Sequence, residues 1–272
     1  MGGIGKKKVW TAVFFVPPII VLIIAGPPAV LPLMVLLATY FGLREFYNLA
    51  LPHSGPVERV LGIGLGLIFS ALMAFGTAGW MAPFLVFLLL CLSVLFMVTS
   101  EDLSSTILNL GVTLFGIVYI GFLLSHVSHI RNIPEGKAWA LFLITTVWAG
   151  DISAYFCGSR FGKHKLYPKI SPKKTVEGLI GAVIGSILVA LAFSQLFIPQ
   201  LEKGLCILIA IGLGILGQVG DFTESMLKRS AQVKDSGSLI PGHGGMLDRL
   251  DSFLFSAPFL YYLLLILFRE NP

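Results

Sequence analysis

Charged residues are scarce in this 272-residue chain: 12% of its residues are Asp, Glu, Lys or Arg, whereas 56% are hydrophobic. The mean hydropathy of +0.89 lies well outside the range of soluble domains and excludes an ordinary soluble protein. Cysteine is also rare: Cys91, Cys157 and Cys206 share no metal-ligand spacing, which argues against a zinc site or a disulfide scaffold. No basic stripe interleaved with aromatics is present, so no nucleic-acid partner is expected.

Long apolar runs are abundant instead, and nine of them approach or reach the length of about 17–25 residues that crosses a bilayer. They lie at 9–26, 29–43, 59–78, 80–99, 106–126, 138–158, 176–198, 204–221 and 252–268. These runs predict an all-α polytopic membrane protein with about nine transmembrane helices. We divide it into an N-terminal region, 1–136, with spans 1–5, and a C-terminal catalytic region, 137–272, with spans 6–9 and two hydrophilic loops, 159–175 and 222–251.

The distribution of basic residues predicts the orientation, because short cytoplasmic loops collect Lys and Arg. With the N-terminus inside, 15 of the 19 basic residues fall on one side and only Arg131, Lys137, Lys203 and Arg269 on the other. We therefore expect a cytoplasmic N-terminus, an external C-terminus and both hydrophilic loops in the cytoplasm. The net charge of +5 suits a cytoplasmic face that rests against anionic headgroups.

Glycines recur inside the later spans. Gly212-Leu-Gly214-Ile-Leu-Gly217 matches a dinucleotide-binding pattern, but it lies within a membrane span with no strand before it. Close packing of helices is the better interpretation, as it is for Gly181 and Gly185.

The eighth span ends in a charged helix face. An ionised Asp is costly inside a bilayer, so Asp221 should face a polar cavity. On a continuing helix Asp221, Glu224, Ser225 and Lys228 follow one another at positions i, i+3, i+4 and i+7 and share one face. The alternative is a solvated helix end.

A glycine-rich turn, Pro241-Gly-His-Gly-Gly245, stands directly before a helix that is expected to begin near Leu247. Backbone N–H groups of such a turn at a helix N-terminus form an anion site. Asp248 and Asp251 follow on one face of that helix, and carboxylates beside a phosphate site indicate a divalent cation such as Mg²⁺. The sequence thus predicts metal-assisted chemistry on a polyphosphate at the cytoplasmic surface.

A second basic cluster occupies the loop 159–175. Lys173, Lys174 and Ser171 either contact substrate phosphates at the mouth of the site or serve only as a positively charged membrane anchor. Asp151, inside the sixth span, is either a third metal or water ligand or the acceptor of a helix–helix hydrogen bond.

The segment Ser225-x-Leu-Lys-Arg-x4-Lys234-Asp235-x-Gly237-x2-Ile-Pro-x-His243-Gly-Gly245-Met-x-Asp248-Arg249-Leu-Asp251 resembles the C-terminal motif of the phosphatidate cytidylyltransferases, also called CDP-diacylglycerol synthases. Three upstream segments are similar to the same family: Gly220-Asp221-x-x-Glu224, Asp151-x-x-Ala-Tyr155 and Ile170-Ser-Pro-Lys-Lys-Thr175-x-Glu-Gly178. In the first half of the chain the similarity rests only on hydropathy and the number of spans.

The resemblance implies transfer of CMP from CTP to phosphatidic acid, giving CDP-diacylglycerol and pyrophosphate, by an enzyme of the cytoplasmic or inner membrane whose active site faces the cytoplasm. It implies Mg²⁺, with one or two metal ions, held by Asp221, Asp248 and Asp251, with Asp151 as a further candidate. It also implies a homodimer.

Under this interpretation the phosphates are neutralised by Lys228, Arg229, Lys234 and Arg249. Glu224 and Ser225 join the substrate-binding set, and the 242–245 backbone, with Gly244 and Gly245, cradles part of the triphosphate. His243 either donates to a phosphate oxygen or is only a turn residue. Asp235 either orients Lys234 or contacts the cytosine or ribose.

Two other functions compete with this one. A CTP-dependent polyprenol kinase would transfer the γ-phosphate and release CDP. A transporter or channel would use Asp151 and Asp221 to line an ion path.

Overall fold

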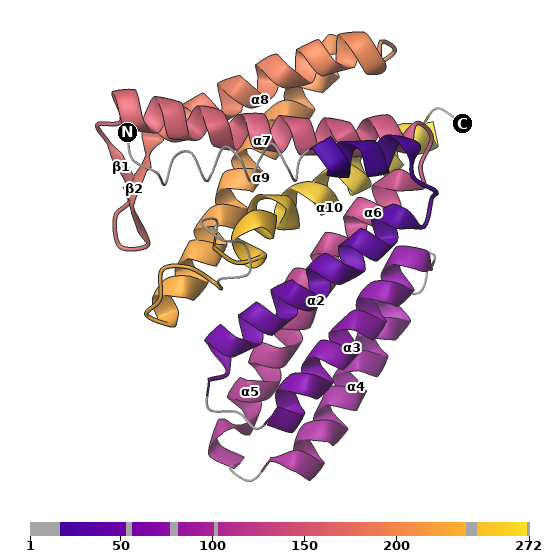
Figure 1. The fold of residues 1–272 in the computed structure, drawn as a ribbon, viewed down its shortest axis with the longest axis vertical. Helices are drawn as coiled ribbons and strands as arrows, with labels where there is room; N and C mark the ends of the chain where they lie inside the picture. The colour runs from indigo at the N-terminus through magenta and orange to yellow at the C-terminus, as the bar shows by residue number, and fades with distance from the viewer. Residues whose placement is uncertain (1–16, 53–55, 77–80, 101–102, 238–243, 271–272) are drawn as a thin grey trace.

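The protein is a bundle of long apolar helices with one small hairpin (Figure 1). The structure, a computed structural model, describes residues 17–52, 56–76, 81–100, 103–237 and 244–270. Within this part of the chain eight helices are long and apolar enough to cross a membrane. Residues 17–25 are also helical, and the rest of the predicted first span, 9–16, lies outside the described residues. The prediction of an α-helical polytopic protein is confirmed.

The N-terminal region contributes α2 (Val30–Ala50), α3 (Pro56–Phe75), α4 (Met81–Thr99), α5 (Leu103–Gly116) and α6 (Leu123–Arg131). Helices α5 and α6 form one continuous rod, because the π-helical turn η2 (Ile117–Phe122) joins them. This rod packs against α2, and Leu43, Phe46 and Tyr47 of α2 are buried in one cluster with Ile120 of η2. Helix α2 ends at residue 50, not near 43 as predicted, so about two further turns of α2 place Arg44 and Glu45 on a helix rather than in a loop.

The C-terminal region consists of α7 (Gly136–Phe161), α8 (Val176–Phe197), α9 (Lys203–Ser230) and α10 (Leu247–Glu270). Helices α7 and α8 run side by side across the top of Figure 1, and α9 and α10 cross beneath them toward α2. Close approach needs small residues: a Cβ on Gly181 would lie 3.0 Å from the Ser153 carbonyl oxygen, and one on Gly214 would lie 3.2 Å from the Val183 Cα. The glycines therefore pack helices, as predicted.

The loop 159–175 differs from the prediction. Helix α7 continues to Phe161, and an antiparallel hairpin follows, formed by β1 (Lys165–Tyr167) and β2 (Ser171–Thr175). Thr175 ends the hairpin and caps α8, since its hydroxyl accepts a hydrogen bond from the Gly178 N–H at 3.1 Å. Glu177 holds the other strand, accepting hydrogen bonds from the Lys163 and His164 backbone N–H groups. This basic segment is therefore fixed against α8.

Candidate active site

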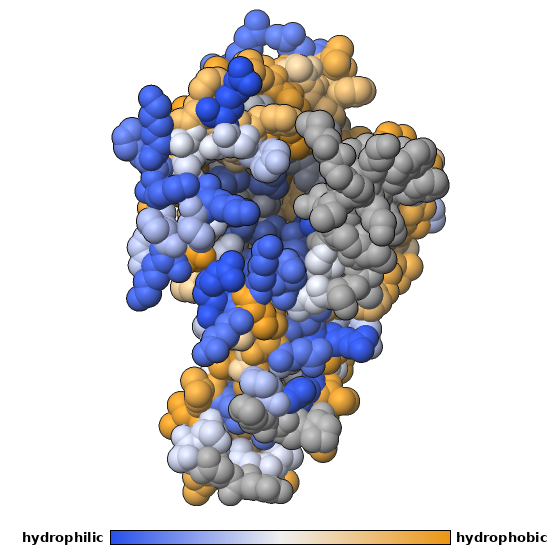
Figure 2. All heavy atoms as spheres, turned by 60° about the vertical axis from the view of Figure 1, so that its left-hand side comes forward, coloured by the Kyte–Doolittle hydropathy of each residue, from blue (hydrophilic) through white to orange (hydrophobic). Residues whose placement is uncertain are grey.

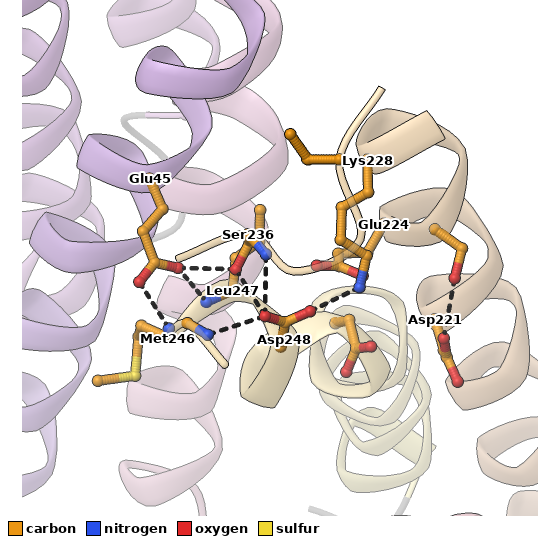
Figure 3. A network of polar contacts seen from close by, with 12 residues as sticks. Glu45, Asp221, Glu224, Lys228, Ser236, Met246, Leu247 and Asp248 are labelled. Atoms are coloured by element: carbon orange, nitrogen blue, oxygen red, sulfur yellow. Dashed lines mark hydrogen bonds and ion pairs between the residues drawn. The ribbon is translucent and has the colours of Figure 1, made fainter. Parts of the chain in front are cut away.

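Asp248, in the first turn of α10, is the centre of a polar network (Figure 3). Its Oδ2 accepts hydrogen bonds from the Gly245 N–H at 2.8 Å, the Ser236 N–H at 3.0 Å and the Ser236 hydroxyl at 2.9 Å. Its Oδ1 faces the Lys228 Nζ at 2.5 Å. Asp248 thereby ties the segment before α10 to the end of α9.

Lys228 lies between two carboxylates. Its ammonium pairs with Asp248 and, one helical turn back along α9, with Glu224. All three side chains are largely buried, and Glu224 is fully so. A buried charge is expensive unless it is paired, and the one ammonium is shared by both acids here. Of the four residues predicted to share one face, Glu224 and Lys228 form a buried ion pair rather than a solvated helix end, whereas Asp221 pairs with Lys174 instead.

The N-terminus of α10 binds an anion, as predicted, but that anion belongs to the protein. The Met246 and Leu247 N–H groups donate to the two carboxylate oxygens of Glu45 at 2.8 and 2.9 Å, while the Gly245 N–H donates to Asp248. In this structure Asp248 accepts the Gly245 N–H, and the contact of Gly245 with a triphosphate stays a prediction. Gly244 has φ 78, a left-handed conformation that favours glycine, and His243 lies outside the described residues.

Glu45 is a member of this polar network that the sequence analysis did not single out. It lies on α2, is 9% exposed, and also accepts a hydrogen bond from the Ser236 hydroxyl at 2.9 Å. The sequence could have indicated Glu45, because a carboxylate at the end of an apolar segment is costly; the same reasoning identified Asp221.

Asp221 faces a different direction from Glu224, toward the hairpin. Its Oδ2 lies 2.8 Å from the Lys174 Nζ, and its Oδ1 accepts a hydrogen bond from the Ser225 hydroxyl at 3.4 Å. The Lys174 ammonium also lies 4.0 Å from the centre of the Phe222 ring. Lys174 is thus brought into the site and is more than a membrane anchor.

A cavity of about 500 Å³ opens beside this ion pair. Its lining includes two carboxylates and two lysines from α7, α9 and β2, namely Asp151, Asp221, Lys173 and Lys174. Tyr155 and Phe222 add aromatic rings. The cavity therefore brings together the basic segment around Lys174 and the acidic end of α9 at Asp221, which lie about 50 residues apart in the sequence.

Asp151 makes the helix–helix hydrogen bond that was one of its two predicted roles. Its Oδ1 accepts from the Gln218 side-chain amide of α9 at 3.0 Å and from the Ser252 hydroxyl of α10 at 3.3 Å. It thereby fixes α7 against both helices at the cavity wall.

Asp251 completes a set of acids on the inner side of the site. Its Oδ1 accepts from the Ser252 N–H at 2.7 Å, and Asp221, Glu224 and Asp151 lie near enough to interact with it electrostatically. These are oxygen donors of the kind that Mg²⁺ prefers, and a cation would relieve their mutual repulsion. Among the described residues no group of three or more such side chains is already arranged to hold a metal. Asp248, in particular, uses both oxygens within the protein.

The remaining predicted residues lie around this centre. Arg229 is exposed and donates to the Ile170 carbonyl at 3.3 Å and the Val233 carbonyl at 2.9 Å, so it connects α9 to the hairpin. Lys234, Asp235 and Arg249 are exposed, and Ser171 is half-buried at the start of β2.

Hydrophilic side chains gather on the face that carries the hairpin and the end of α9, where the surface is hollowed between them (Figure 2). Apolar side chains lie around much of this band on the face shown.

The sequence is similar to those of known proteins. The model of the cytidylyltransferase family matches residues 6–267. A phosphatidate cytidylyltransferase of Bacillus subtilis (strain 168) is 44% identical over 160 residues, covering 57% of this chain and 58% of the relative. One from Synechocystis sp. is 34% identical over 260 residues, covering 85% and 87%. The match thus spans about 58% of the length of the former and most of the latter. With a family match over nearly its whole length, the chain belongs to the cytidylyltransferase family.

Proposed function

We propose that the protein transfers CMP from CTP to phosphatidic acid and releases CDP-diacylglycerol and pyrophosphate. The observation that carries this proposal is the cavity lined by Lys173, Lys174, Asp151 and Asp221, in which Lys174 pairs with Asp221. Cations and carboxylates together suit a metal-bound polyphosphate better than either charge alone. The names of the relatives supply the substrates.

The reaction needs positioning and charge neutralisation more than proton transfer. A phosphate monoester has a second pKa near 6, so the lipid phosphate is already largely ionised at neutral pH and needs no general base. One of its oxygens attacks the CTP α-phosphorus, and the bond to the β-phosphate oxygen breaks. Lys173, Lys174 and Lys228 stabilise the charge that moves onto pyrophosphate.

Mg²⁺ is the proposed cofactor. Asp221 and Asp251 would hold it, with Asp151 and Asp248 as further candidates, and substrate phosphates and water would complete its coordination. When bound, the ion neutralises nucleotide phosphates and stabilises the leaving group. A second metal ion is compatible with four acids.

A lipid substrate also needs apolar surroundings. A groove of about 970 Å³ lies between the end of α2, α5 and the end of α9, with Phe46, Ile107, Phe115 and Leu227 in its wall. It runs beside the helix turn that carries Lys228, so it offers a place for acyl chains next to the phosphate site. We further propose that this end of the protein faces the cytoplasm of the cell membrane and that the protein is a homodimer.

The test uses purified protein in detergent with phosphatidic acid, Mg²⁺ and CTP labelled at the α-phosphate. Label in the lipid phase, release of pyrophosphate and loss of both on chelation of Mg²⁺ are expected. CDP formation with a polyprenol, but no lipid label, would favour the kinase. Ion flux across sealed vesicles without any CTP turnover would favour the transporter.

A further inference from the structure

Glu45 stands apart from every residue that the sequence motifs identify. It comes from α2, in the N-terminal region, whereas the residues of the site belong to α7–α10 and the segments between them. Its carboxylate nevertheless lies within the Asp248 network (Figure 3). We propose that Glu45 is a positioning residue, which holds the first turn of α10 so that Asp248 faces Lys228. This inference rests on the proposed function.

The first step is the pair of hydrogen bonds between Glu45 and the backbone of α10. Each oxygen of Glu45 accepts one N–H of the α10 N-terminus, Met246 at 2.8 Å and Leu247 at 2.9 Å. These N–H groups have no partner within the helix, and the helix dipole favours a negative charge beside them. The carboxylate therefore fixes both the place and the direction of the start of α10.

The second step is the link to Asp248. The Ser236 hydroxyl lies 2.9 Å from Glu45 Oε2 and 2.9 Å from Asp248 Oδ2. A hydroxyl has one hydrogen, so Ser236 divides its donation between the two acids and holds them at a fixed separation. Asp248 then presents its other oxygen to Lys228. Displacement of Glu45 would therefore shift Ser236 and the first turn of α10, and with them the contact between Asp248 and Lys228.

The third step is the space reserved for this carboxylate. A Cβ on Gly237 would lie 2.6 Å from Glu45 Oε1, and one on Gly245 would lie 2.6 Å from its Cδ. Neither glycine has a positive φ, so their backbones do not require glycine. Two glycines of the C-terminal motif are therefore explained by a side chain from α2.

The decisive variant is Glu45→Gln. A glutamine has one acceptor oxygen, and its NH₂ group would face a second backbone N–H, so Met246 or Leu247 loses its partner. Glu58→Gln is the matched control: Glu58 is also buried, at 8% exposure, but lies on α3. Gly237→Ala keeps Glu45 and displaces it, which keeps the proposal testable if Glu45→Gln does not fold.

Two readouts are needed on the full-length protein in detergent. Hydrogen–deuterium exchange of the Met246 and Leu247 amides should become about tenfold faster in Glu45→Gln and in Gly237→Ala, but not in Glu58→Gln. The kcat for CMP transfer should fall about 10–100-fold, as for loss of other supporting partners, with a much smaller change in the KM for CTP.

Unchanged exchange, or a normal kcat in a folded Glu45→Gln protein, would overturn the proposal. A purely structural role would lower the thermal midpoint and the active fraction, but it would leave the kcat of the folded fraction intact, and that result also overturns it. If the unmodified protein transfers no CMP, the proposed function fails, and the exchange rates alone decide whether Glu45 holds α10.

Discussion

Replacement of Asp248 by Asn tests the centre of the site. The asparagine oxygen can still accept from Gly245 and Ser236, but the NH₂ group then faces the Lys228 ammonium, which lies 2.5 Å from the Asp248 oxygen in the unmodified protein. Lys228 keeps its ion pair with Glu224 in this variant, so only one charged contact is lost. We expect the free energy of unfolding to fall by about 1.5–3 kcal/mol, the value of one hydrogen bond to a charged group. The protein should therefore still fold.

The effect on turnover should be larger. A misaligned Lys228 no longer stabilises the charge that develops on pyrophosphate, and loss of one such preorganised contact costs about 10²–10³ in kcat, or about 2.7–4 kcal/mol. The assay is label transfer from CTP to phosphatidic acid, measured alongside the thermal midpoint. Glu202→Gln, the same chemical change at an exposed residue before α9, is the control. Near-normal activity of a folded Asp248→Asn protein would refute the role assigned to this carboxylate.

Three further predictions address other parts of the molecule. Lys174→Gln removes the 2.8 Å ion pair with Asp221 and should raise the KM for CTP about tenfold or more; an unchanged KM would remove Lys174 from the nucleotide site. Thr175→Ala removes the cap of α8 and should cost about 1 kcal/mol, seen as a lower thermal midpoint, whereas an unaltered midpoint would contradict the capping role. A single cysteine at exposed residue 169, in a protein without the three native cysteines, should react with an impermeant thiol reagent only after the cells are opened. Labelling of residue 169 in intact cells would show that the predicted orientation is wrong.

The long spans could be predicted because a bilayer imposes a simple rule on composition and length. Their ends were less certain. Helix α2 extends to Ala50 and α9 to Ser230, beyond the apolar runs that marked their spans. The hairpin at 165–175 was missed, since its strands carry polar residues without the alternation that marks a half-buried strand.

The sequence by itself determined that this is a helical membrane protein, and it predicted that the chemistry lies between Asp221 and Asp251, because charge in an apolar chain is costly. It also placed Glu224 and Lys228 on one face, since helical periodicity is local. Only the tertiary structure decided the partner of each group. Glu45 and the α10 N-terminus lie 201 residues apart in the chain yet 2.8 Å apart in space, and that meeting decides which anion fills the turn. No local pattern encodes it, because it depends on how α2 packs against α10.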